Sequence, residues 1–199
     1  MRARDPSEAN SLDFDELDDE ALVRLIQNEC QAQKAFTILY RRHITMVFRY
    51  LVARVETEED AQDLTSQTFM AALEALSKFE GRAKFTTWLI GIARNKATDH
   101  LRRQRNTLSL DVAQTIPYPT PHLDEIVEQN LKLDLIIRTM RVLSPDRAEA
   151  LTLHSFAGLS ATQVAEIMDK KEPAVRMLIH RAIRDIRKRL NINIQESVS

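Results

Sequence analysis

The sequence predicts an all-α protein made of two small helical domains joined by an extended linker. Only 3 Gly and 6 Pro occur in 199 residues, while Leu, Ala, Arg, Glu and Ile dominate, a composition that favours helix. Apolar residues recur at helical spacing in most segments. Pro117, Pro119 and Pro121 alternate in one short stretch, where proline blocks helix and favours extended chain.

The N-terminal domain is predicted to be a bundle of about four helices over residues 18–106, preceded by an acidic segment, 1–17, that we expect to be disordered. A helix begins after Thr57, which can cap it, with Asp60 at the third helical position. Gly81 interrupts the pattern before the fourth helix. The residues predicted to be buried in the first three helices are Leu22, Leu25 and Ile26, then Phe36, Leu39, Tyr40, Val47 and Leu51, then Leu64, Phe69 and Leu73.

The C-terminal domain is predicted over residues 130–190, after a linker at 107–129 and before a tail at 191–199. Ser144 is a suitable N-cap, with Pro145 at the first helical position. Ser160 and Gln163 have the spacing of a capping box, and Asp169 stands at the break before a basic helix. A short capped helix, a tight break and a second helix with exposed bases indicate a helix-turn-helix. The alternative is a plain helical hairpin with a solvated basic face.

Charge is distributed unevenly along a chain whose net charge is only −1. Residues 1–20 contain eight acids and two bases, residues 94–105 contain five bases and one acid, and residues 170–190 contain eight bases and two acids. Two basic patches on a nearly neutral chain favour nucleic-acid binding more than the total charge does. Two solvated helix faces remain the alternative.

The segment FTTWLIGIARNKATDHLRRQRN, residues 85–106, divides into two faces when it is plotted as a helix at about 100° per residue. Its apolar face holds Leu89, Ala93, Ala97 and Leu101. A separate line of residues, which we name the polar stripe, consists of Trp88, Asn95, Asp99 and Arg102. An aromatic ring, an amide and a guanidinium suit unstacked bases, base edges and phosphates. Alternatively, Trp88 packs on a neighbouring helix and Asp99 pairs with Arg102 or Arg103.

Other functional classes find little support in the sequence. The chain has no Gly-rich phosphate loop, and its five His and one Cys lack metal-ligand spacing. We therefore expect no enzymatic activity, no catalytic residues, no cofactor and no metal. Cys30 as the single cysteine fits a reducing compartment. An acidic N-terminus and no apolar run of about 18 residues predict a cytoplasmic protein without membrane insertion.

Several long motifs resemble the extracytoplasmic-function (ECF) group of bacterial RNA polymerase sigma factors. In the N-terminal domain, AFTILYRRH, EEDAQDLTSQTFMAAL and KFEGRAKFTTWLIGIARNKATDHLRRQ resemble the family's second conserved region. In the C-terminal domain, LSPDRAEALTLHSFAGLSATQVAEIM followed by AVRMLIHRAIRDIRKRL resembles its fourth. The order and separation of the motifs match the family over most of the chain.

The resemblance implies a subunit that binds core RNA polymerase, through the β′ clamp helices and the β flap, and directs promoter-specific transcription initiation. Region 2 would recognise and melt the −10 element, region 4 would bind the −35 element, and an anti-sigma factor would control the protein. The residues that the resemblance assigns to −10 DNA are Arg82, Lys84, Trp88, Asn95, Asp99, Arg102 and Arg103. Those assigned to −35 DNA are Lys171, Arg176, Met177, His180 and Arg181, and those assigned to polymerase are Gln62, Asp63, Ser66 and Gln67.

The sequence departs from the family pattern in its recognition helix. Pro173, Met177 and Leu178 stand where small, polar or basic residues are frequent, so the family's usual −35 sequence is not assumed for this chain. A one-component helix-turn-helix regulator and a helical interaction protein are the competing functions. A simple regulator has no need for the polar stripe on a second domain, and a protein with merely solvated basic faces would not bind promoters.

Overall fold

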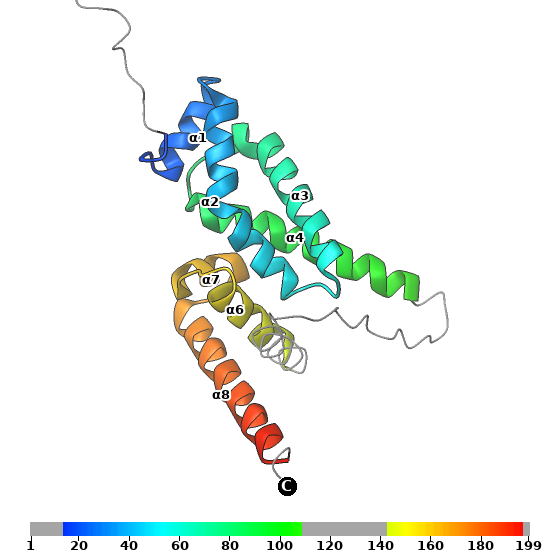
Figure 1. Ribbon diagram of the computed structural model, residues 1–199. Coiled ribbons are helices and arrows are strands. Elements are labelled where there is room, and N and C mark those ends of the chain that lie inside the picture. Colours follow the sequence, from blue (N-terminus) through cyan, green and yellow to red (C-terminus); the bar gives the residue numbers. More distant parts are fainter. Residues whose placement is uncertain (1–13, 109–142, 197–199) are drawn as a thin grey trace, which may run out of the picture.

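The computed structural model describes residues 14–108 and 143–196, and the helices of this part form two units (Figure 1). The N-terminal unit contains α1 (Asp19–Gln27), α2 (Ala32–Val52), α3 (Glu58–Ala75), the short 3-10 helix η2 (Leu76–Lys78) and α4 (Phe85–Leu108). The C-terminal unit contains α6 (Pro145–Ser155), α7 (Ala161–Met168) and α8 (Glu172–Glu196). The described residues contain no strand, which confirms the predicted all-α class. The predicted linker lies outside the described residues, except that 107 and 108 belong to α4.

Helix starts follow the capping residues that the sequence indicates. The Thr57 hydroxyl accepts a hydrogen bond from the Asp60 amide at 3.1 Å, which satisfies one free amide at the start of α3. Ser160 and Gln163 form both bonds of a capping box at α7. Ser144 has the extended backbone of an N-cap before Pro145, but its side chain makes no capping hydrogen bond.

The two faces of α4 separate as the helical plot predicts. Leu89, Ala93 and Ala97 are fully buried in the N-terminal unit, and Leu101 is half-buried. Burying such a face is the main source of stability for a helix in a small bundle. α4 is therefore held by one side, and its other side is left to solvent.

Three expectations about the N-terminal unit are wrong. Tyr40, predicted to be buried, is 38% exposed. Leu73 is 50% exposed, because it lies beside Met70 on the outer side of α3, whereas Leu64 and Phe69 are buried as predicted. Residues 14–17 belong to the packed unit and not to a disordered segment. Phe14 is only 4% exposed, and Arg42 donates to the backbone carbonyls of residues 15 and 17 at 2.7 and 2.6 Å.

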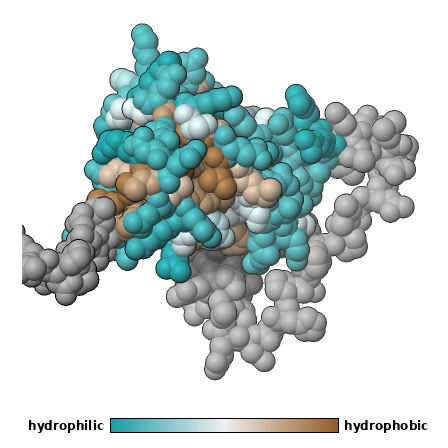
Figure 2. All heavy atoms as spheres, turned by 90° about the horizontal axis from the view of Figure 1, so that it is seen from above, coloured by the Kyte–Doolittle hydropathy of each residue, from teal (hydrophilic) through white to brown (hydrophobic). Residues whose placement is uncertain are grey.

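Apolar side chains also reach the surface. Seen from above the view of Figure 1, one face has apolar residues exposed near its centre and polar residues around them (Figure 2). Among the described residues, the large apolar side chains with the greatest exposure are Tyr40, Met70, Leu73 and Met177. Three of them lie on α2 and α3, so these two helices expose more apolar area than their packing requires.

Candidate nucleic-acid interface

The start of α4 is fixed by a braced loop at residues 79–84. The Gln27 side-chain amide donates to the carbonyl oxygens of Leu76 and Phe79 at 3.1 and 2.8 Å, which ties the loop to the end of α1. Gly81 has a φ of +70°, a left-handed conformation that glycine adopts without steric cost. Phe85 is buried immediately after the loop. The polar stripe therefore begins from a defined position.

Trp88 lies half-buried at the head of α4, within an aromatic cluster. Its ring centroid is 4.9 Å from that of Phe79 and 5.8 Å from that of Phe85. These tilted contacts hold the indole against the loop. The helical plot placed Trp88 off the main apolar face, and the structure adds that the indole packs on the loop before its own helix.

The remaining residues of the stripe lie in solvent. Asn95, Asp99 and Arg102 are all exposed, as is Arg103 beside them in the sequence. Asp99 accepts from Arg102 at 3.3 Å, and the two side chains are 52% and 76% exposed. An ion pair this exposed contributes little stability and is readily exchanged for a phosphate. The alternative prediction that Asp99 pairs with Arg102 is thus correct for this pair, but the Arg102 guanidinium stays on the surface.

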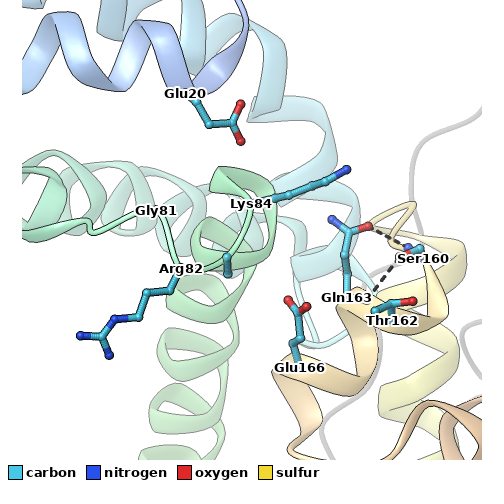
Figure 3. A pocket seen from close by; sticks show the side chains of 9 residues that line it. Glu20, Gly81, Arg82, Lys84, Ser160, Thr162, Gln163 and Glu166 are labelled. Carbon is cyan, nitrogen blue, oxygen red and sulfur yellow. Dashed lines mark hydrogen bonds between the residues drawn. The ribbon is translucent and has the colours of Figure 1, made fainter.

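The loop before α4 carries two further cations beside a cleft of about 500 Å³ between the two units (Figure 3). Lys84 points toward α7, whereas Arg82 points away from it (Figure 3) and pairs with Glu80. Residues Ser160, Thr162, Gln163 and Glu166 line the opposite side. Both cations are exposed, and Lys84 extends the positive surface of α4 toward the C-terminal unit.

The C-terminal unit has the predicted helix-turn-helix arrangement. α7 ends at Asp169, whose φ of +52° is left-handed, a conformation that Asp tolerates better than most residues. The amide of Lys170 donates to the carbonyl oxygen of Ala165 at 3.0 Å, which closes the end of α7. α8 then begins with Pro173 in its first turn, where the missing amide hydrogen is harmless.

The residues of α8 and its preceding turn that were assigned to DNA all lie in solvent: Lys171, Arg176, Met177, His180 and Arg181. Arg176 is engaged with Glu172, one turn earlier, donating through Nε at 2.8 Å and through Nη2 at 2.6 Å. Hydrogen bonds from Arg176 and then from Thr162 lower the pKa of Glu172. The opposite side of α8, with Val175, Ile179, Ala182 and Ile186, is buried.

The residues assigned to polymerase lie together on the outer face of α3. Gln62, Asp63 and Ser66 are exposed and Gln67 is half-buried. Their hydrogen bonds run along the helix, from Gln62 to Glu58 at 3.2 Å and from Gln67 to Asp63 at 2.6 Å. Met70 and Leu73, 64% and 50% exposed, continue this face toward the end of the helix. A polar row thus leads into an exposed apolar pair.

Sequence reasoning missed a buried polar cluster between the two units. The Glu149 carboxylate in α6 is 6% exposed. It accepts from the Tyr50 hydroxyl at 3.1 Å, from Arg94 Nε at 3.1 Å and from Arg54 Nη1 at 2.8 Å. Burial, then the charge of Glu149, raises the pKa of Tyr50 far above its ordinary value, so its hydroxyl remains a donor. We name these four residues the Glu149 clamp. No periodic pattern marks them, since they come from three helices.

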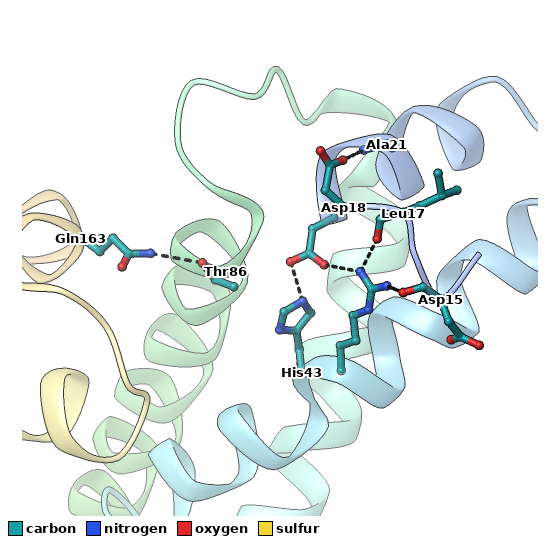
Figure 4. A network of polar contacts seen from close by, with 9 residues as sticks. Asp15, Leu17, Asp18, Ala21, His43, Thr86 and Gln163 are labelled. Atoms are coloured by element: carbon teal, nitrogen blue, oxygen red, sulfur yellow. Dashed lines mark hydrogen bonds and ion pairs between the residues drawn. The ribbon is translucent and has the colours of Figure 1, made fainter. Parts of the chain in front are cut away.

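A second contact between the units joins the start of α4 to α7 (Figure 4). The Gln163 amide donates to the hydroxyls of Thr86 and Thr87 at 3.2 and 3.1 Å. Because the same amide group supplies the carbonyl of the α7 capping box, one side chain both caps a helix and joins the two units.

The polar network beside this contact holds α1 on α2 (Figure 4). The Asp19 carboxylate lies 2.7 Å from His43 Nε2 and 3.2 Å from Arg42 Nη1. Burial alone would raise the pKa of Asp19, but the hydrogen bonds and charges of His43 and Arg42 outweigh it and lower the pKa. The network thus favours the ionised carboxylate.

Residues 14–108 and 143–196 contain no group of three or more His, Cys, Asp or Glu side chains able to hold a metal ion. None of the described helices combines the length and apolarity that a membrane crossing needs.

Comparison with known proteins assigns both units to families. Residues 39–107 match the family Sigma-70 region 2, and residues 133–186 match the family Sigma-70, region 4. The ECF RNA polymerase sigma-E factor of Escherichia coli K12 is 33% identical over 178 residues, covering 84% of this chain and 92% of that one. The ECF RNA polymerase sigma factor BldN of Streptomyces coelicolor is 32% identical over 155 residues, covering 76% of this chain but only 59% of BldN.

A solved structure supports the same fold. The sigma factor RpoE of Bartonella quintana, in complex with the anti-sigma factor NepR, gives a TM-score of 0.69 over 80% of this chain and 98% of that one, at 21% identity. The matches to sigma region 2 and region 4, in chain order, and the full-length similarity to sigma-E factors agree with each other. The chain therefore belongs to the ECF group of RNA polymerase sigma factors.

Proposed function

We propose that the protein binds core RNA polymerase and directs initiation at specific promoters, with the N-terminal unit recognising and melting the −10 element and the C-terminal unit binding the −35 element. One observation carries this proposal. α4 buries Leu89, Ala93 and Ala97 and exposes Asn95, Asp99 and Arg102, in a chain that also carries a helix-turn-helix with a basic exposed face. Two separate nucleic-acid surfaces suit a protein that contacts one promoter at two places.

On the N-terminal unit, the polar stripe is suited to single-stranded DNA. Trp88 and the neighbouring aromatic rings offer a surface for an unstacked base, and the Asn95 amide offers both a donor and an acceptor to a base edge. Arg102 is 76% exposed, so it can reach a phosphate after releasing Asp99. We assign Arg82, Lys84 and Arg103 to contacts with the phosphate backbone of the same DNA.

On the C-terminal unit, α8 is suited to the major groove of the −35 element. Arg176 presents the fork that pairs with guanine, although in the free protein it is bonded to Glu172. Met177 is 53% exposed, and an apolar side chain at this place suits the methyl group of thymine. Lys171, His180 and Arg181 surround these two residues and are assigned to phosphates and base edges.

Polymerase would bind the outer face of α3, where Gln62, Asp63, Ser66 and Gln67 lead into Met70 and Leu73. Exposed apolar side chains within a polar surround are typical of protein–protein interfaces. We assign this face to the β′ clamp helices and the C-terminal unit to the β flap. The role requires no catalytic group, and we propose that the protein is not an enzyme and acts in the cytoplasm.

Control by an anti-sigma factor is part of the proposal. Two of the similar solved structures are complexes, one of RpoE with the anti-sigma factor NepR and one of CnrH with the cytosolic domain of CnrY. The similarity to CnrH has a TM-score of 0.68 at 24% identity. The shared fold supports a comparable partner for this chain, without identifying it.

Transcription in vitro tests the function. The purified protein would be added to core RNA polymerase with genomic fragments as templates, and the 5′ ends of the transcripts would be mapped. The proposal predicts a small set of start sites that share one pair of upstream elements. Core polymerase alone serves as the control. A protein that binds DNA but selects no start sites would be a one-component regulator, and the proposal would be wrong.

A further inference from the structure

The Glu149 clamp is unusual among the polar contacts of the described residues, because it is buried and it joins the two units. The carboxylate comes from α6, whereas Tyr50 and Arg94 come from α2 and α4, and Arg54 directly follows α2. All three donors lie within 3.1 Å of a carboxylate oxygen. A buried carboxylate with such partners is costly to leave unpaired, so it fixes one arrangement of the elements that carry it.

Other contacts support the same closed arrangement. Gln163 of α7 donates to Thr86 and Thr87 at the start of α4. The buried apolar side chains of the two units belong to one continuous cluster. Closure therefore brings the start of α4 directly against α7 of the helix-turn-helix.

The interface is nevertheless incompletely packed. A cleft of about 500 Å³ separates the loop at Gly81–Lys84 from α7. Arg54 Nε is buried without a hydrogen-bond partner, which lowers the stability of the closed form. An interface with an unpaired donor and an open cleft is less stable than a fully packed one. Contacts with another partner can therefore replace it, and closure is suited to be reversible.

The closed arrangement is too short to bind both promoter elements. At about 1.5 Å per residue, Asn95 lies about 14 Å along α4 from Thr86. The path from Gln163 through the turn to Arg176 adds no more than about 25 Å. If the Asn95–Thr86 path, the Thr86–Gln163 contact and the Gln163–Arg176 path lay in one straight line, Asn95 and Arg176 would still be at most about 50 Å apart. Elements centred about 25 base pairs apart are separated by about 85 Å of straight duplex.

We propose that Glu149 is a latch, whose carboxylate, held by Tyr50, Arg54 and Arg94, keeps the two units closed in the free protein in a form that cannot engage both promoter elements. Core polymerase opens the latch by binding the units at separate places. The inability of the closed form to use a promoter rests on the proposed function. The closure itself depends only on the contacts between the units.

Distance measurement between spin labels tests the latch in the full-length protein. Cys30, the only cysteine of the chain, is exposed and provides a label on the N-terminal unit. Lys188→Cys, at an exposed position of α8, provides the second. We expect one narrow distance distribution, at a distance shorter than in any opened form. Glu149→Gln removes the charge at nearly constant volume, and most of the short-distance population should be lost to longer distances.

A second variant and a matched control separate opening from unfolding. Arg94→Gln removes the charged donor that α4 supplies to the Glu149 clamp, on a side chain that is 38% exposed. This variant should open the protein in the same way. Glu166→Gln makes the same chemical change as Glu149→Gln, on an exposed side chain at the cleft, and should leave the distances unchanged. Far-UV circular dichroism should show native helix content in all variants.

Three results would overturn the latch: a broad distance distribution in the unmodified background, unchanged short distances in both clamp variants, or the loss of closure in Glu166→Gln as well. The wild-type pair should also lengthen when core polymerase is added, with complex formation followed separately by gel filtration. A complex that forms with the short distance retained would contradict the opening step. If no complex forms, the proposed function fails, while the clamp variants of the free protein still decide whether Glu149 holds the units closed.

Discussion

Arg176 illustrates how a side chain that we propose contacts DNA is kept in place in the free protein. Its two hydrogen bonds to Glu172, at 2.8 and 2.6 Å, hold the guanidinium over the first turn of α8, and 69% of its side chain remains exposed. The sequence identified Arg176 as a candidate from its place on a basic helix. It did not reveal the pairing, because a Glu four residues before an Arg is also common on helices with no function in binding.

The substitution Arg176→Ala should weaken binding of a −35 duplex by about 1–3 kcal/mol if the guanidinium reads a base edge. The loss should be greatest for the preferred sequence. Arg187→Ala removes an equal charge from an exposed position farther along α8 and should cause a smaller loss that is similar for all sequences. Fluorescence anisotropy titrations at fixed salt would measure both, and equal effects of the two variants would refute base readout.

Asp19 shows a structural role for a charged residue in the N-terminal unit. Its native pKa is lowered from 3.8, so its contribution to the free energy of unfolding is present above that pH and is lost as the pH falls through the lower native value. Asp19→Asn should therefore destabilise the protein by about 1–2 kcal/mol at neutral pH and by less at a pH well below 3.8, where the native carboxylate also becomes protonated.

Urea unfolding at the two pH values would measure this difference. Glu56→Gln, a change at an exposed carboxylate, is the control, and its stability should follow that of the wild type at both pH values. A loss for Asp19→Asn that is equal at both pH values would assign the effect to packing and not to charge.

At the scale of the helix, capping explains most of what could be predicted. Thr57, Ser160 with Gln163, and Asp169 each occupy the position that their side chain or backbone preference indicates. The prediction for Leu73 failed because a helix in a small bundle has a buried face narrower than its apolar residues suggest, and periodicity alone cannot tell a core residue from an exposed interface residue.

The capping box of α7 gives a test at this scale. Ser160→Ala removes the hydroxyl that accepts a hydrogen bond from the backbone amide of Gln163. The free energy of unfolding should fall by about 1 kcal/mol. Ser144→Ala changes an N-cap residue whose hydroxyl makes no capping bond, so the cost should be clearly smaller. Thermal unfolding of the two variants compares them directly, and equal losses would show that the box contributes nothing beyond the backbone geometry.

At the scale of the whole molecule, the fold class, the two units and the two basic surfaces follow from the sequence, since each depends on local pattern or on motifs in chain order. The relation between the units does not. Glu149 lies 99 residues from Tyr50 and 55 from Arg94 along the chain, and no local preference marks it. Contacts of this kind depend on how complete units pack, which composition and periodicity do not determine.

The two faces of α4 remain the central feature of the molecule. Leu89, Ala93 and Ala97 form its buried face, while Asn95 lies on its exposed face. Removing the Asn95 side chain should therefore leave folding intact and affect only the function of the surface. Thr98→Ala is a matched change on the same helix, since the Thr98 hydroxyl is already bonded to the carbonyl of Arg94 at 2.8 Å.

The most direct measurement is permanganate reactivity of −10 thymines in promoter complexes formed by core polymerase with wild type, Asn95→Ala or Thr98→Ala. We expect Asn95→Ala to reduce the open fraction about tenfold, the effect of losing one good base contact, with an unchanged melting temperature and with Thr98→Ala close to wild type. Wild-type opening by Asn95→Ala would contradict the assignment of the polar stripe to promoter melting.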